Sequence, residues 1–157
     1  MSDIPPVAHY LATHGIAHRV FRHIGPVHSL EQAAAERGQQ PNQVVRSLLF
    51  RLTEGTYAMV LMAGPSQVDW RALRRFVGQS RLTTASEEEV LTVTGYPIGA
   101  VAPFGVPQPL RVLVDESVLT QEEISIGSGV RGTTIIMRVV DLMRALGDVE
   151  VGRFHSE

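Results

Sequence analysis

The sequence predicts an α+β fold, with residues 1–157 forming one domain around a mixed β-sheet with flanking helices. The length of 157 residues suits a single domain whose core is large enough to fold alone. Strand-like and helix-like segments are interspersed without a regular βαβ alternation, and two neighbouring strand-like runs resemble a hairpin. These features together favour an α+β domain around a mixed sheet.

Strands are expected where β-branched and large apolar residues cluster. The expected strands are residues 16–21, 44–52, 56–62, 110–114 and 133–137. Glu54 and Gly55 separate the second run from the third, and this arrangement predicts the hairpin. Residues 48–50 are apolar without a break, which indicates a strand that is more than half buried.

Capping residues place helices between these strands. The expected helix caps are Asp3, Ser29, Asp69 and Ser86. Two of them match a capping box, because Gln32 follows Ser29 and Glu89 follows Ser86 three residues later. On the helix of residues 69–78 the spacing directs Trp70, Leu73 and Val77 inward. A last helix is expected over residues 139–146.

The composition limits the classes of partner. The formal net charge is −2 and 19% of residues are charged, so no general attraction to nucleic acid or membrane is expected. Any nucleic-acid contact must come from a local patch. Cysteine is absent, which excludes disulfides and thiolate chemistry. No apolar run approaches the roughly 20 residues needed to span a bilayer, and the first residues do not resemble a signal peptide. We expect a cytoplasmic protein that binds neither membrane nor DNA.

Residues 95–105 form an uncharged stretch of three glycines and two prolines in the middle of this pattern. Loops are normally polar, so an apolar loop of this kind either lines a binding site with its backbone or is a buried crossover between strands. Residues 127–132 form a second glycine cluster, which lacks the Gly-Lys-Ser/Thr ending of a phosphate loop. If the two segments face one another, their N–H groups could form an oxyanion hole.

Several cationic residues are candidates for a site, each with a structural alternative. Arg46 opens an apolar strand, so it lies either at an exposed strand end or in a cleft. Three arginines share i, i+3 and i+4 spacing on one helix and form either a solvated face or a phosphate-binding face; they are Arg71, Arg74 and Arg75. His28 precedes a helix start and faces either a pocket or solvent. The histidines show no metal-binding spacing, and no nucleophile-elbow motif is present.

Four segments in this order resemble the YbaK/prolyl-tRNA-synthetase-associated domain family, the free-standing aminoacyl-tRNA deacylases. They are His28 with residues 31–34, residues 45–50, residues 94–105 and residues 126–132. Gly99 to Pro103 is similar to the family's Gly-x-x-x-Pro substrate-binding loop. The resemblance implies a curved, barrel-like sheet. It also implies hydrolysis of the ester between a misattached small amino acid and tRNA, such as Cys- or Ala-tRNA(Pro), with a synthetase as a further partner and no cofactor or metal.

The same resemblance implies the roles of individual residues. Arg46 occupies the position of a lysine in similar proteins, where it would neutralise phosphate or carbonyl charge. Gly99 and Ala100 would supply the oxyanion contact. The expected substrate-binding residues are His28, Ser47, Pro103, Phe104, Gly127, Ser128 and Gly129, and Arg71, Arg74 and Arg75 are expected to bind tRNA. The alternative is a module on the same fold that binds aminoacyl-tRNA or nucleotide with weakened catalysis, because a guanidinium differs in shape from an ammonium.

Overall fold

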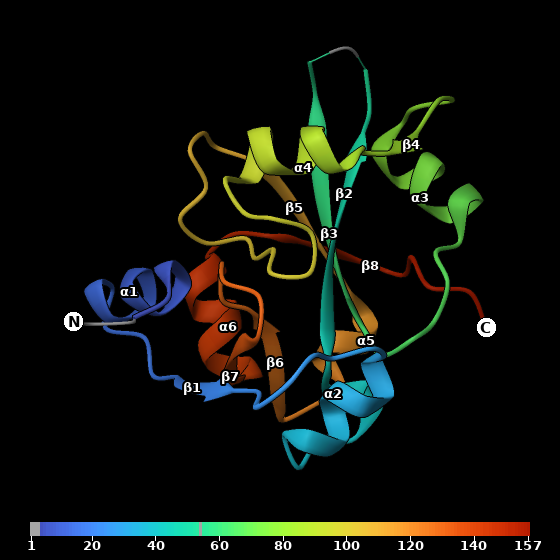
Figure 1. Ribbon diagram of the computed structural model, residues 1–157. Coiled ribbons are helices and arrows are strands. Elements are labelled where there is room, and N and C mark those ends of the chain that lie inside the picture. Colours follow the sequence, from blue (N-terminus) through green and yellow to red (C-terminus); the bar gives the residue numbers. More distant parts are fainter. Residues whose placement is uncertain (1–3, 54) are drawn as a thin grey trace.

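The computed structural model describes residues 4–53 and 55–157 and confirms the mixed α+β class (Figure 1). The helices are α1 (Pro6–Thr13), α2 (Leu30–Glu36), the 3-10 helix η1 (Pro41–Gln43), α3 (Trp70–Val77), α4 (Glu87–Thr94), α5 (Glu116–Leu119) and α6 (Val139–Leu146). The strands are β1 (Arg19–Arg22), β2 (Val45–Arg51), β3 (Tyr57–Ala63), β4 (Thr83–Thr84), β5 (Arg111–Asp115), β6 (Glu123–Gly127), β7 (Thr133–Arg138) and β8 (Glu150–Gly152). No helix among these residues is long and apolar enough to cross a bilayer.

The strands form two open sheets, and neither closes into a barrel within the described residues. The larger sheet has the order β4-β2-β3-β5-β8, and the smaller has the order β1-β7-β6. The predicted hairpin is confirmed, because β2 pairs antiparallel with β3 over its whole length. Parallel pairing of β3 with β5, and of β5 with β8, makes the larger sheet mixed. A single parallel bridge between Val44 and Ser125 joins the two sheets at one end of β2.

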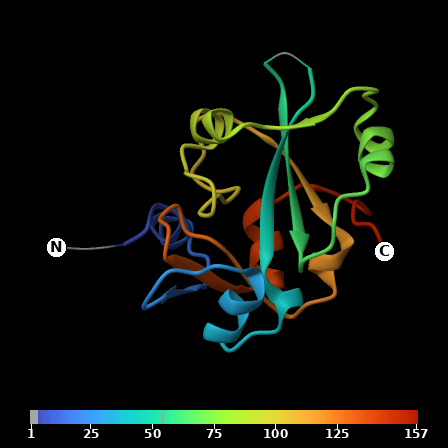
Figure 2. The same cartoon turned by 45° about the vertical axis from the view of Figure 1, so that its right-hand side comes forward.

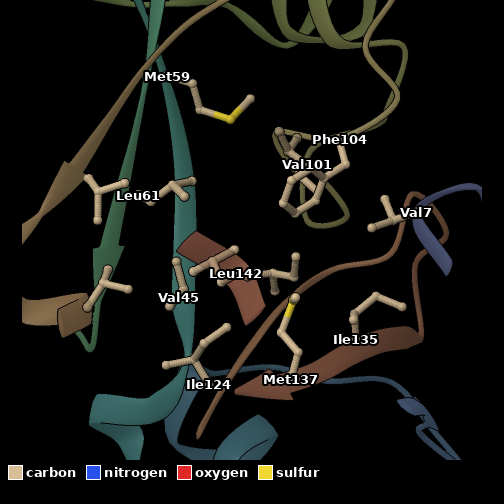
Figure 3. Packing of buried hydrophobic residues seen from close by; sticks show 14 of the residues in the cluster. Val7, Val45, Met59, Leu61, Val101, Phe104, Ile124, Ile135, Met137 and Leu142 are labelled. Carbon is tan, nitrogen blue, oxygen red and sulfur yellow. The ribbon is translucent and has the colours of Figure 1, made fainter. Parts of the chain in front are cut away.

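A buried apolar cluster holds the two sheets together (Figure 3). Val45 and Leu61 come from the hairpin, Ile124 and Ile135 from the smaller sheet, and Leu142 from α6. A second cluster lies under α3 and contains Phe50, Leu73 and Phe154. Because side chains alternate along a strand, the hairpin serves both clusters at once, which explains its continuous apolar sequence.

The capping residues confirm most of the predicted helix starts. Ser86 and Glu89 form both bonds of a capping box, at 3.1 and 2.9 Å. Ser29 accepts from the Gln32 N–H, but the Gln32 side chain accepts from the N–H of His28 rather than from that of Ser29. The expected cap Asp3 lies outside the described residues, and α1 begins after Pro5.

One inward prediction on α3 is wrong. Leu73 is buried, but Trp70 is 37% exposed. Its ring meets Phe50 edge-on at 5.4 Å, on the side of the hairpin where the candidate site lies.

Candidate substrate pocket

A pocket of about 530 Å³ opens beside β2, between the two sheets. At one end the bridge of Val44 to Ser125 joins the sheets, and at the other the N–H of Ala85 donates to the carbonyl of Leu49 at 3.0 Å. Between these two points the edge of β2 has no strand partner in the described chain. Figure 2 shows the loop after α4, in yellow, descending beside the hairpin toward this region. The pocket therefore occupies a gap that the sheet topology itself creates.

Strand geometry decides which side chains reach the pocket. Residues bridged across neighbouring strands direct their side chains to the same face, so Val44 and Ser125 share a face. Arg46 follows Val44 by two positions and lies on that face as well, as does Gly127 on β6. Both residues line the pocket. Arg46 and Gly127 are thus placed in one pocket, although 80 residues separate them in the chain.

The two glycine segments are packed against each other. The N–H of Gly129 donates to the Ala100 carbonyl at 2.9 Å, and Arg131 Nε donates to the Ile98 carbonyl at 2.8 Å. A Cβ on Gly127 would lie 2.2 Å from the carbonyl oxygen of Val101, closer than atoms can approach. The second segment must therefore carry glycine here for the first to close over it.

Residues 97–100 form a tight turn that presents Gly99 to the pocket. The N–H of Ala100 donates to the Pro97 carbonyl at 3.0 Å, and Gly99 has φ +92°, as the third position of a type II turn requires. Ala100 is fully buried and its N–H is occupied, so it does not present an oxyanion donor as expected. The N–H groups of Gly99 and Val101 have no acceptor in the described residues, and both residues line the pocket.

Arg46 lines the pocket with its guanidinium anchored to backbone. Nε donates to the Gly64 carbonyl at 2.8 Å, and a short bond joins Nη2 to the carbonyl of Ser66. Burial lowers the pKa of Arg46, and the negative charge of Asp115 opposes this shift. Both acceptors are neutral, so the positive charge of Arg46 remains available to an anion in the pocket.

Ser47 has a buried hydroxyl in the pocket wall. Its Oγ has no hydrogen-bond partner in the described residues, although Ser47 lines the pocket. Buried hydroxyls are nearly always hydrogen-bonded, because an unpaired one costs about 1–3 kcal/mol. A bound ligand or water would satisfy it, which supports the predicted contact of Ser47 with substrate.

Arg37 is a pocket residue that the sequence prediction missed. It follows the last turn of α2, where a basic residue is typical of an exposed helix end, so no sequence signal distinguishes it. Its Nε donates to His23 Nε2 at 3.1 Å and its Nη1 to Ser125 Oγ at 2.9 Å. Burial lowers its pKa to about 10, so Arg37 remains cationic at neutral pH.

Five predicted substrate residues lie outside this pocket. Ser128 is fully buried, and its hydroxyl bonds to Val130 and Thr133 within its own turn. The N–H of Gly129 donates to the Ala100 carbonyl. Pro103 and Phe104 line a separate cavity of about 360 Å³ near α6. His28 is exposed, and its N–H contacts Gln32. Ser128, Gly129, Pro103 and Phe104 share a glycine segment with pocket residues, whereas His28 lies in a loop that contributes none.

The three predicted arginines lie on α3 and are not part of the pocket lining. Arg71 and Arg75 are exposed and Arg74 is half-buried, and none pairs with a carboxylate in the part of the chain that is described. Trp70 begins the same helix and lines the pocket. An unpaired cationic face next to an exposed indole is typical of single-strand nucleic-acid contacts. Within residues 4–53 and 55–157, no group of three His, Cys, Asp or Glu side chains could hold a metal ion.

The part of the chain that contains the pocket resembles a known protein family. The profile of the aminoacyl-tRNA editing domain matches residues 25–145, which include the whole pocket lining. The chain belongs to the aminoacyl-tRNA editing domain family. The family assignment confirms the resemblance that the sequence motifs predicted.

Curated relatives of this editing domain are proline–tRNA ligases. The ligase of Thermosipho melanesiensis is 28% identical over 105 residues, which are 67% of this chain and 18% of the ligase. The ligase of Kosmotoga olearia is 31% identical over 101 residues, which are 64% of this chain and 17% of the ligase. The chain thus spans less than a fifth of the length of these relatives.

Solved structures match the editing domain along its whole length. A candidate trans-editing enzyme for prolyl tRNA synthetase is 28% identical with a TM-score of 0.88, and the match covers 100% of this chain and 99% of that one. A scaffold protein used for computational epitope grafting is 25% identical with a TM-score of 0.89, and the match covers 100% of both chains.

Proposed function

We propose that this protein is a trans-acting deacylase that hydrolyses the ester between a misattached small amino acid and tRNA, of the Cys- or Ala-tRNA(Pro) type. Residues 1–157 would act as one editing domain in the cytoplasm, alone or with a synthetase. The observation that carries the proposal is the pocket of about 530 Å³ in a chain of the editing family. That volume lies within the range of about 300–1,000 Å³ for small-molecule sites and suits an aminoacyl-adenosine end.

The pocket residues suit ester hydrolysis without a protein nucleophile. A water molecule, oriented by a ribose hydroxyl of the tRNA, attacks the ester carbonyl, and the carbonyl oxygen becomes negative. The unoccupied N–H groups of Gly99 and Val101 are the donors that we assign to this oxygen. Arg46 holds the phosphate or the developing charge, and Ser47 with Gly127 borders the acyl group. Cleavage releases the amino acid and leaves the ribose hydroxyl of the tRNA.

Recognition of the tRNA itself falls to α3. Arg71, Arg74 and Arg75 bind phosphates of the acceptor end, and Trp70 offers a stacking surface for a base. Stacking of a base on an aromatic ring contributes about 1–3 kcal/mol and does not depend on the sequence of the nucleic acid. Because the overall charge is −2, we expect the protein to bind nucleic acid through this local cationic patch.

A deacylation panel tests the function. Purified protein is incubated with tRNA(Pro) charged with Ala, Cys, Ser or Pro, and loss of the ester is followed over time. We expect hydrolysis of at least one small noncognate aminoacyl-tRNA and sparing of Pro-tRNA(Pro). Because one methylene in a pocket is worth only about 1–3 kcal/mol, related small amino acids should be hydrolysed within about 200-fold of each other. Rates equal to the uncatalysed rate for all four substrates would contradict the proposal.

A binding module is the second candidate, and the anchoring of Arg46 favours it. A guanidinium held by the carbonyls of Gly64 and Ser66 is less free to follow a developing charge than a lysine ammonium. Arg46→Ala and Arg46→Lys separate the two functions in single-turnover hydrolysis. For a deacylase, Arg46→Ala should lower the rate about 10²-fold and Arg46→Lys should retain it. A wild type as slow as Arg46→Ala, with only Arg46→Lys fast, would indicate the binding module.

A further inference from the structure

We propose that Arg37 binds a phosphate group of the ligand in this pocket, as a second cation beside Arg46. The proposal rests on the proposed function only for the source of that phosphate, the acceptor end of tRNA. Arg37 approaches from α2 and meets Ser125 on β6, whose side chain lies on the same face as Arg46. The two guanidinium groups thus flank the point where the sheets diverge.

The charge balance of the pocket favours an anion. Arg37 and Arg46 are the charged side chains among the described residues that line it, and no Asp or Glu is among them. Four of their donors are used by neutral acceptors: His23, Ser125 and two backbone carbonyls. A guanidinium has five N–H donors, so each arginine keeps donors for a ligand. Arg37 Nη2 and Arg46 Nη1 have no acceptor within residues 4–53 and 55–157.

A partly buried hydrogen-bond chain fixes the orientation of Arg37. Since Arg37 Nε can only donate, His23 Nε2 must accept, and the proton of the neutral imidazole lies on Nδ1. That Nδ1 group contacts Glu36 Oε1 at 2.6 Å, and the His23 side chain is only 1% exposed. Glu36 is therefore separated from Arg37 by the imidazole. The arrangement holds the guanidinium rigidly without neutralising it through a direct carboxylate contact.

Rigid cations favour phosphate over the amino end of the substrate. A fixed, partly desolvated guanidinium repels the α-ammonium of an aminoacyl group and attracts phosphate oxygens, which accept two parallel N–H bonds. We therefore assign the Arg37 end of the pocket to the phosphate and not to the amino acid.

Binding of AMP and of adenosine to the same protein tests this assignment, because the two differ by the phosphate alone. Wild type should bind AMP more tightly than adenosine in NMR titrations. Arg37→Gln should weaken AMP binding about 10- to 100-fold, the scale of one charge-assisted contact, and leave adenosine binding unchanged. Ser125→Ala, which removes one partner that orients Arg37, should weaken AMP binding in the same direction but less. Arg138→Gln, an exposed arginine outside the pocket, removes the same charge and should have no effect.

The source of the phosphate is tested with tRNA. If the ligand is the acceptor end, Arg37→Gln should also raise KM for deacylation. The slope of log KM against log salt concentration should fall by about one, because one phosphate contact is lost. If only AMP binding changes, the site takes free mononucleotides. The assignment is overturned if Arg37→Gln weakens AMP and adenosine equally, since this indicates a structural role, or if it weakens neither. If the wild type does not hydrolyse aminoacyl-tRNA, the proposed function is wrong. The comparison of AMP with adenosine still tests the assignment of Arg37 in that case.

Discussion

Replacement of Gly127 by alanine tests the contact between the two glycine segments. A Cβ at this position would lie 2.2 Å from the Val101 carbonyl oxygen and 2.6 Å from the Ala100 carbonyl carbon. Both atoms belong to backbone, which cannot rotate away as a side chain can. The turn over the pocket must therefore move outward. Overpacking of this kind costs about 1–3 kcal/mol, and a protein of this size loses about 2–4 °C in Tm per kcal/mol.

Thermal unfolding and deacylation are measured together on Gly127→Ala. We expect Tm to fall by about 2–12 °C and hydrolysis to fall more than the fraction of folded protein does, because Gly99 and Val101 are displaced from the substrate. Gly25→Ala is the matched control: a Cβ there has no neighbour within 4 Å, and its φ is not positive. It should leave both quantities unchanged. A Gly127→Ala protein with wild-type Tm and activity would refute the close contact and the role of the turn.

Two further predictions concern α3 and the start of α4. Replacing Arg74 and Arg75 together by alanine should weaken binding of all tRNAs similarly and reduce its salt dependence, and an unchanged salt slope would make these arginines a solvated face. The pKa of Glu89 is lowered to about 2, first by the Ser86 N–H and then by the Tyr57 hydroxyl, from a usual value of 4.5. Its ionised form therefore stabilises the fold fully above pH 4.5, and this contribution is lost as the pH falls toward 2. Glu89→Gln should lower Tm at pH 7, and the difference from wild type should shrink by pH 2.5; a constant difference would contradict the shift.

Local sequence determined most of the elements and part of the site. The hairpin, the caps at Ser29, Asp69 and Ser86, and the pairing of glycine with tight turns depend on residues close together in the chain, so they could be predicted. Arg46, Ser47, Gly99 and Gly127 line the pocket. Strand alternation accounts for the face that Arg46 shares with Val44, and the positive φ of Gly99 accounts for the tight turn, because both are local properties. Their roles in catalysis stay predictions.

Tertiary structure alone decided which neighbours of these residues face the pocket. Ala100 and Ser128 adjoin pocket residues, but both are fully buried and their polar groups bond within their own turns or with the facing segment. Pro103 and Phe104 continue the glycine loop into a second cavity. Arg37 and Trp70 enter the pocket from helices that a periodicity argument treats as ordinary. The sequence by itself determined the local conformations. The bridge of Val44 to Ser125 joins the two sheets, and the placement of the sheets decides which side chains share the pocket. Such a contact joins positions 81 residues apart, and no local pattern encodes it.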